Sequence, residues 1–155
     1  MKLSTKGRYA VMAMVDLAQF AESGPVALAE VAERQEISLS YLEQLFAKLR
    51  RAGLVTSVRG PGGGYRLAHP AEDIRVSDVI AAVDEAIRTT GCKPGAAAGC
   101  IRRTSRCMTH DLWAGLGDQI YAYLDSVSLA DVCAGRVDPQ PPRASAPSLT
   151  EIAAE

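Results

Sequence analysis

The chain has 155 residues, a net charge of −1 and an apolar fraction of 48%, values typical of one globular domain with a short appendage. No stretch approaches the roughly 20 apolar residues of a membrane-spanning helix, and the apolar run at 9–15 ends at Asp16 without a clear signal-peptide cleavage site. We therefore expect a cytoplasmic protein without a membrane partner, in which the four cysteines are metal ligands, redox sensors or core residues rather than disulfides.

The charge is distributed unevenly along the chain. Residues 1–70 contain 9 Lys/Arg and 6 Asp/Glu, whereas residues 71–155 contain 8 and 12. Between Gln44 and Arg66 the sequence carries five cations and no acidic residue. A near-neutral total therefore does not exclude nucleic acid as a partner, because phosphate contacts depend on the local basic block.

The first half of the chain predicts a helix–turn–helix followed by a β-hairpin. One segment is apolar on most faces, and the next two carry apolar residues at helical spacing. A tight connection at residues 36–37 joins the second and third of these, and Ser38 can cap the third. The expected elements are helices at 6–22, 27–35 and 38–52 and strands at 54–58 and 65–68, which flank a glycine-rich turn at 59–64.

The second half predicts further helices around an irregular segment at 90–107. The expected elements are a helix capped by Ser77 and ending near Arg88, a long helix ending near Ser126, and a short helix capped by Ser128 and ending at Gly135. The long helix carries an apolar stripe of Leu112, Leu116, Ile120, Tyr123, Leu124 and Val127. The predicted fold class is mainly α, a winged helix–turn–helix with a small β-hairpin wing and a long additional helix.

The third helix sorts its residues into an inner and an outer face. An amphipathic helix alone is equally typical of a helical core, but the preceding helix and the hairpin favour a DNA reader. Gln44 can pair with an adenine, and Ser40 and Tyr41 can bond a base edge or a phosphate. Glu43 is repelled by phosphates unless it accepts from a cytosine amino group, so it selects sequence. The predicted DNA-binding residues of this helix are Ser38, Ser40, Tyr41, Glu43, Gln44 and Lys48.

Three further cations are expected on DNA. Arg59 lies at the hairpin tip, where we expect it in the minor groove or on phosphate. Lys6 and Arg8 lie at the start of the first helix and are expected to clamp phosphates. The glycine run 60–64 is not a nucleotide-binding loop, because a strand pattern rather than Gly-Lys-Ser/Thr and a helix follows it.

The cysteine-rich segment predicts a metal centre. Cys92, Cys100 and Cys107 are separated by seven and six residues, and His110 follows Cys107 after two. Cys107 and His110 lie one helical turn apart, and three thiolates plus an imidazole suit zinc or an iron–sulfur cluster. The segment lacks the close cysteine pair of most structural zinc sites. Its four cations, with no acid between Gly91 and Met108, would stabilise thiolates and an anionic cluster.

Alternatives to a cluster remain open on spacing alone: a zinc site, or three thiols that bind no metal. Cys133 is expected to be a small buried hydrophobe. Cys107 and His110 could in principle form a nucleophilic pair. The sequence offers no acid to orient the histidine and no oxyanion site, so we do not expect an enzyme.

Several stretches resemble the iron–sulfur cluster regulators called IscR. The similarity covers residues 1 to about 135 and is most specific in MKLSTKGRYA, ISLSYLEQLF, VRGPGGGY and CMTH followed by LW. The intervals between the cysteines are longer here than in the best-known members. Sibling sensors of nitric oxide or iron use cysteine-only ligation, so His110 favours the IscR resemblance over them.

The resemblance implies a homodimeric repressor or activator that binds pseudo-palindromic double-stranded DNA and regulates iron–sulfur assembly genes. It implies one 2Fe–2S cluster per subunit, supplied by the iron–sulfur assembly machinery, on Cys92, Cys100, Cys107 and His110. The alternatives are a zinc-stapled or thiol-redox-switched repressor, or a nitric-oxide or iron sensor of the same broad family. The expected division is 1–89 winged helix–turn–helix domain, 90–110 cluster-binding loop, 111–135 dimerisation helix and short terminal helix, and 136–155 disordered tail.

Overall fold

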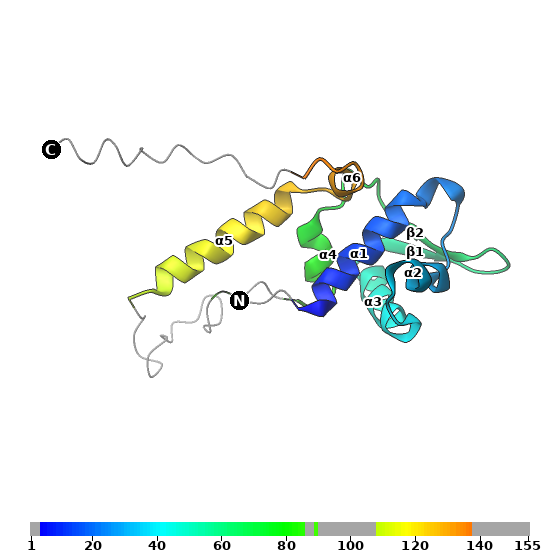
Figure 1. Cartoon of the computed structure of the whole chain (residues 1–155), viewed down its shortest axis with the longest axis horizontal. Coiled ribbons are helices and arrows are strands. Elements are labelled where there is room, and N and C mark those ends of the chain that lie inside the picture. Colours follow the sequence, from blue (N-terminus) through cyan, green and yellow to red (C-terminus); the bar gives the residue numbers. More distant parts are fainter. Residues whose placement is uncertain (1–3, 86–88, 90–107, 138–155) are drawn as a thin grey trace.

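The computed structural model describes residues 4–85, 89 and 108–137. It contains α1 (Thr5–Gln19), a one-turn helix η1 (Ala21–Ser23), α2 (Leu28–Gln35), α3 (Leu39–Arg51), β1 (Val55–Val58), β2 (Gly64–Leu67), α4 (Val76–Ala82), α5 (His110–Ser126) and α6 (Leu129–Cys133). Figure 1 shows α2, α3, α4 and α6 gathered around α1, with the hairpin on one side and α5 extending away on the other. The predicted mainly helical fold with a two-stranded hairpin is confirmed.

The core is aliphatic, as the low aromatic content requires, and α1 lies at its centre. Met14 and Leu17 of α1 are buried together with Leu45 and Phe46 of α3. The Phe46 ring meets Tyr65 of β2 edge-on, with 4.9 Å between ring centroids, so the wing and α3 share one apolar cluster. Burial of this face holds α3 in one orientation relative to the hairpin.

The turn between α2 and α3 is tight, as predicted. Glu36 adopts the left-handed conformation with φ of 53°, which reverses the chain after α2, and Ile37 is buried beside it. Ser38 occupies the N-cap position of α3, but its side chain makes no capping hydrogen bond. Gly53 follows α3 with φ of 77°, which ends the helix where the sequence predicts.

The hairpin is antiparallel, with Val55 opposite Leu67 and Val58 opposite Gly64. An isolated bridge between Val26 and Tyr65 adds the segment before α2 to its edge. A side chain at Gly64 would collide with the backbone of Val26, so glycine is required at this crossing. That glycine therefore serves the packing of the wing against the domain.

The predicted helix after the hairpin has different limits in the structure. α4 begins at Val76 and ends at Ala82, well before residue 88, and Asp84 turns the chain with φ of 56°. The prediction that Ser77 caps the helix is wrong, because Ser77 lies inside α4, is buried, and donates to Asp125 Oδ1 of α5 at 2.7 Å. Tertiary packing thus overrides the local capping signal.

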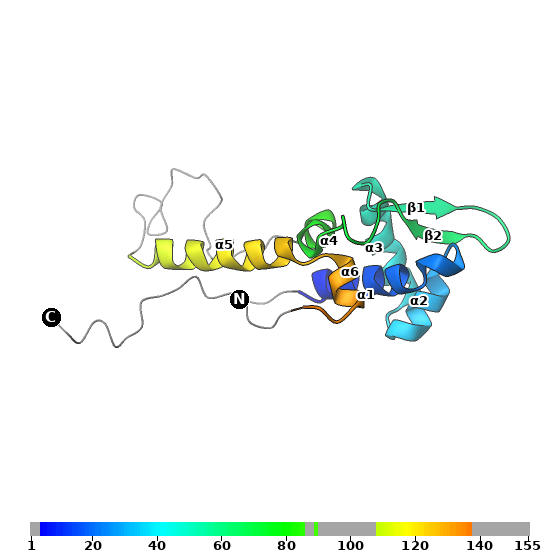
Figure 2. The ribbon, with the colours of Figure 1, turned by 90° about the horizontal axis from the view of Figure 1, so that it is seen from above.

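α5 is a long helix without a buried residue in the single chain, and Figures 1 and 2 both show it projecting from the helical body. Its C-terminal end is attached to the domain, because Val76 donates its backbone N–H to Val127 O at 3.0 Å. Ser128 caps α6 as predicted, in a reciprocal pair with Asp131. The predicted disordered tail falls outside the described residues beyond Val137.

Candidate DNA-binding surface and cluster ligands

α3 presents a polar outer face along its first two turns. Leu42, Leu45, Phe46 and Leu49 are buried, which fixes the rotation of the helix about its axis. The predicted readers Ser38, Ser40, Glu43 and Gln44 are all exposed. Such a row at the N-terminal end of the second helix of a helix–turn–helix is the part that enters a major groove.

Tyr41 is less outward than predicted. It is half-buried, and its ring meets Tyr9 of α1 edge-on at a centroid distance of 6.1 Å. Tyr41 also packs against the main apolar cluster. The sequence could not show this contact, because Tyr9 lies on a different helix whose position depends on the whole core.

Lys48 lies further along α3 and is paired with an acid from another element. Its Nζ is 2.7 Å from Asp84 Oδ2, just beyond the end of α4. Lys6 of α1 donates from Nζ to the backbone carbonyl oxygen of Asp84 at 3.3 Å. The hydrogen bond and charge of Lys48 hold the pKa of Asp84 below its ordinary value of 3.8. Two lysines predicted to bind DNA therefore meet at Asp84, which no sequence motif marks.

Glu85, the next residue, caps the start of α1. Its carboxylate accepts from the backbone N–H groups of Ser4 and Gly7. A side chain at Gly7 would collide with that carboxylate, so the approach requires glycine there. Burial raises the pKa of Glu85, but the hydrogen bonds from Ser4 and Gly7 and the charge of Lys6 outweigh it and leave the pKa below the ordinary value of 4.5. The segment 84–85 is thus tied to α1 and α3 together.

The wing carries an exposed cation at its tip. Arg59 is exposed in the turn between β1 and β2, which Figure 1 shows extending away from the body of the domain. Arg8 of α1 is also exposed. Arg50 of α3 donates from Nη1 to Ser57 Oγ of β1 at 3.5 Å. The basic block found in the sequence is therefore spread over α3 and the hairpin.

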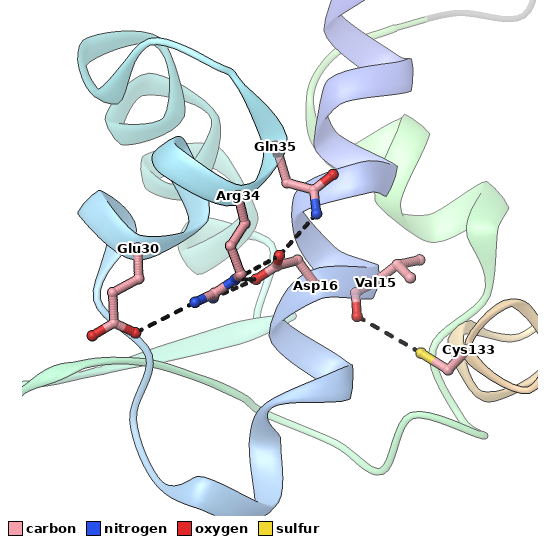
Figure 3. A network of polar contacts seen from close by, with 6 residues as sticks. All are labelled: Val15, Asp16, Glu30, Arg34, Gln35 and Cys133. Carbon is pink, nitrogen blue, oxygen red and sulfur yellow. Dashed lines mark hydrogen bonds and ion pairs between the residues drawn. The ribbon is translucent and has the colours of Figure 1, made fainter.

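An ion pair with a buried carboxylate joins α1 to α2 (Figure 3). Asp16 is 1% exposed, and Arg34 donates to it through Nε at 3.0 Å and through Nη2 at 2.7 Å. Gln35 donates to Asp16 Oδ2 at 2.8 Å, and the Arg34 guanidinium lies 4.1 Å from the centroid of the Phe20 ring. Because α2 leads into α3, this network helps to hold α3 in place relative to α1. Sequence reasoning missed it, since an Asp inside an apolar helix gives no hint of its partner.

Of the four predicted cluster ligands, His110 is the one that the structure describes. It is the first residue of α5 and is half-buried; Cys92, Cys100 and Cys107 lie outside the described residues. Within the described part of the chain, no three His, Cys, Asp or Glu side chains are grouped as metal ligands. The donor set of three thiolates and one imidazole has the chemistry that an iron–sulfur cluster accepts.

Cys133 of α6 is separate from that set. Its Sγ lies 3.7 Å from Val15 O of α1 (Figure 3), and burial raises the pKa of its thiol. A thiol kept protonated against a helix is a packing residue, as expected, although it is half-buried rather than fully buried.

Residues 3–135 match the Rrf2 family model, described as iron-dependent transcriptional regulators. The chain belongs to the Rrf2 family. It is 50% identical over 157 residues to the regulator IscR of Cereibacter sphaeroides, covering all of this chain and 99% of that one. It is 56% identical over 134 residues to IscR of Aliivibrio salmonicida, covering 85% and 77%. The solved structure of T. potens IscR has 43% identity and a TM-score of 0.71, with 88% of each chain covered.

Membership of the Rrf2 family makes this protein a DNA-binding transcription regulator with a winged helix–turn–helix, and the resemblance to IscR is confirmed. Its relatives are transcription regulators. None of the helices in the described ranges is long and apolar enough to cross a membrane.

Proposed function

We propose that this Rrf2-family protein is a homodimer that binds pseudo-palindromic double-stranded DNA operators, and that a 2Fe–2S cluster controls which operators it binds. The observation that supports DNA binding is the division of α3 into two faces. Its apolar face is buried, while Ser40, Glu43 and Gln44 are exposed. Side chains at this position of a helix–turn–helix reach base edges. The genes regulated would be those of iron–sulfur cluster assembly, as the IscR name of its relatives supports.

The predicted contacts divide into two kinds. Gln44 would pair with adenine and Glu43 with a cytosine amino group, while Ser38, Ser40 and Tyr41 would bond base edges or phosphates. Arg59 would enter the minor groove or bind phosphate beside it, and the cations of α1 and α3 would bind phosphate. The phosphate-binding cations are Lys6, Arg8 and Lys48. The first group would choose the sequence, and the cations would supply most of the salt-dependent affinity.

The cluster would be held by Cys92, Cys100, Cys107 and His110, with the segment 90–110 as its binding loop. When bound, it would supply an occupancy signal for the iron–sulfur supply of the cell. His110 begins α5, so ligation would act directly on the first turn of the proposed dimerisation helix. Residues 1–89 would be the DNA-binding domain and 111–135 the dimerisation unit. The protein would act in the cytoplasm as a regulator rather than an enzyme, with the assembly machinery as cluster donor.

Anaerobic purification and reconstitution with iron and sulfide test the cofactor. The expected result is visible absorption with two iron and two sulfide per chain, as a 2Fe–2S cluster requires, and a change in operator choice between loaded and cluster-free protein. His110→Cys should keep the cluster longer under oxygen, because a fourth thiolate replaces a neutral, protonatable ligand.

Cys133→Ala is the matched control, since Cys133 packs on α1, and it should bind the cluster like the unchanged protein. A colourless protein with stoichiometric zinc would replace the cluster by a zinc staple. A protein that binds no metal but responds to thiol oxidation would indicate a redox switch. Unchanged cluster loss in His110→Cys would assign the fourth ligand elsewhere.

A further inference from the structure

The contact between Lys48 and Asp84 crosses from the reading helix to the end of α4. Lys48 Nζ and Asp84 Oδ2 are 2.7 Å apart, and the two side chains are 32% and 75% exposed. Lys48 belongs to the stretch between Gln44 and Arg66 that contains no acidic residue. Asp84 therefore supplies, from a distant part of the chain, an anion that this basic stretch lacks.

The backbone of Asp84 is held in place from several sides. Its N–H donates to Ala81 O at 3.0 Å, and its carbonyl oxygen accepts from Lys6 Nζ. The carboxylate of the next residue, Glu85, accepts from the backbone amides that begin α1. The side chain of Asp84, in contrast, is exposed. The carboxylate is thus presented to Lys48 by a fixed backbone, while solvent can reach the pair and let it open.

Three cations surround this carboxylate. Lys48 bonds it directly, and the charges of Lys6 of α1 and Arg51 of α3 also stabilise its ionised form. A carboxylate among lysines and an arginine is in the same environment as a DNA phosphate on a basic surface, with the same charge sign and the same donors. Asp84 occupies one N–H of the Lys48 ammonium and offsets its charge, so a phosphate at Lys48 meets a weaker attraction and the repulsion of the Asp84 carboxylate.

We propose that Asp84 is an internal competitor for DNA phosphate at Lys48 and sets how tightly the protein binds DNA of any sequence. This inference rests on the proposed function, in which α3 lies on DNA. Binding must break the Lys48–Asp84 pair, leave Lys48 out of the contact, or hold the phosphate on another N–H of the ammonium beside the negative charge of Asp84. Each of these costs phosphate affinity without involving a base edge. Sequence choice stays with Gln44 and Glu43, whereas Asp84 limits the electrostatic part of binding.

The experiment measures binding of the full chain, purified anaerobically, to two fluorescent duplexes of about 30 base pairs, which span two half-sites. One is selected from random-sequence DNA by the unchanged protein, and the other is a scrambled duplex of equal composition. Asp84→Asn should tighten binding to both about two- to fivefold, the range expected for an exposed ion pair. The slope of log K against log salt should steepen by about 0.9, the value for one additional phosphate.

Two controls separate this effect from net charge and from folding. Asp73→Asn removes one negative charge at the other end of α4, where Asp73 is exposed, and should leave the salt slope unchanged. Lys48→Met should weaken binding to both duplexes, and adding Asp84→Asn to it should produce no further change. Thermal unfolding should show that all variants fold.

The outcomes that overturn the inference are distinct from those that overturn the proposed function. Weaker binding by Asp84→Asn would mean that Asp84 positions Lys48 on DNA. An effect equal to that of Asp73→Asn, an effect that persists without Lys48, or no effect at all would each remove the competitor role. If both Lys48→Met and Gln44→Ala leave binding unchanged, α3 does not face DNA and the proposed function itself fails.

Discussion

At the scale of single residues, we propose that the side chains of α3 and the wing divide into readers of bases and binders of phosphate. Gln44 is exposed in the second turn of α3, on the side opposite the buried Leu42 and Leu49. Arg59 is exposed in the turn between β1 and β2. A side chain that reads a base changes the ranking of sequences, while one that binds phosphate changes affinity for all of them.

Gln44→Ala and Arg59→Ala should therefore have different signatures in a binding assay. Gln44→Ala should cost about 1–3 kcal/mol on the selected operator and much less on scrambled DNA, because an adenine contact is lost. Arg59→Ala should weaken both and reduce the salt slope by about 1. Titrations at several salt concentrations measure both quantities. If the two variants exchange these signatures, the assignment of reader and phosphate binder is wrong.

The residue scale also shows where local pattern predicts a site and where it does not. Helical periodicity placed Ser40, Glu43 and Gln44 outside and Leu42 inside, and the structure agrees because burial of one face fixes the other. The glycines of the wing leave room for the close approach of another backbone, but the sequence does not show which one. At Gly64 the close approach is to the backbone of Val26, a contact that depends on how the hairpin packs.

At the scale of elements, α1 and α2 are joined by a polar network inside an apolar interface. Asp16 is almost completely buried, whereas the Arg34 side chain is 31% exposed. Arg34 also faces Glu30 of the same helix at 3.7 Å. The two partners are therefore unequal, because Arg34 has other acceptors when Asp16 is removed and Asp16 keeps Gln35 when Arg34 is removed.

Arg34→Met should consequently destabilise the protein more than Asp16→Asn. The first leaves a buried carboxylate without its cation, which costs about 3–5 kcal/mol of unfolding free energy. The second leaves Arg34 beside Glu30 and solvent and should cost about 1–2 kcal/mol. Urea unfolding of both variants measures the difference. Equal losses, or a larger loss for Asp16→Asn, would show that burial of the Asp16 carboxylate does not determine the cost of breaking the pair.

Element boundaries follow the same division between local and tertiary causes. Gly53 and Ser128 end α3 and cap α6 where the sequence predicts, because each acts within a few residues of its own backbone. Ser77 does not cap α4, since its hydroxyl bonds to Asp125, which is 48 positions away. The early end of α4 places Asp84 against Lys48, so this boundary has a direct effect on the surface proposed to bind DNA.

At the scale of the whole molecule, α5 is the element that the single chain leaves uncovered. Leu112, Leu116 and Ile120 of its apolar stripe lie outside both core clusters, with Leu112 64% exposed, whereas the end of the stripe from Tyr123 on packs against α4. Leu116 and Ile120, in the middle of the helix, are half-exposed. Apolar residues at helical spacing on a projecting helix are the surface that a second copy would bury in a two-fold dimer.

Leu116→Glu should weaken the dimer about 100-fold or more, because it places an unpaired carboxylate in the proposed interface at a cost of about 3 kcal/mol. Operator affinity should fall with it, as each half-site would bind a separate monomer. Sedimentation over a concentration series measures the dimer constant. Ala122→Glu adds the same charge at an exposed position off the stripe and should have little effect. Equal weakening by both variants would show that the apolar stripe is not the dimer interface.

The sequence alone determined the elements whose causes are local. Apolar spacing established α3 and α5, glycine and serine established where α3 ends and α6 begins, and the order of motifs indicated a winged helix–turn–helix with a metal-binding segment. These signals act over one or two turns of chain, so they can be read without knowing the fold.

Only the tertiary structure decided which partner each charged group meets. Asp16 pairs with Arg34 across 18 positions, Lys48 with Asp84 across 36, and Gly7 with Glu85 across 78. The chain contains 17 cations and 18 acids, and no local rule selects among the pairs that they could form. The selection follows from burial of one apolar core, which brings the ends of α1, α3 and α4 together. The acidic Asp84 is thereby placed against Lys48 of α3, the helix proposed to read DNA.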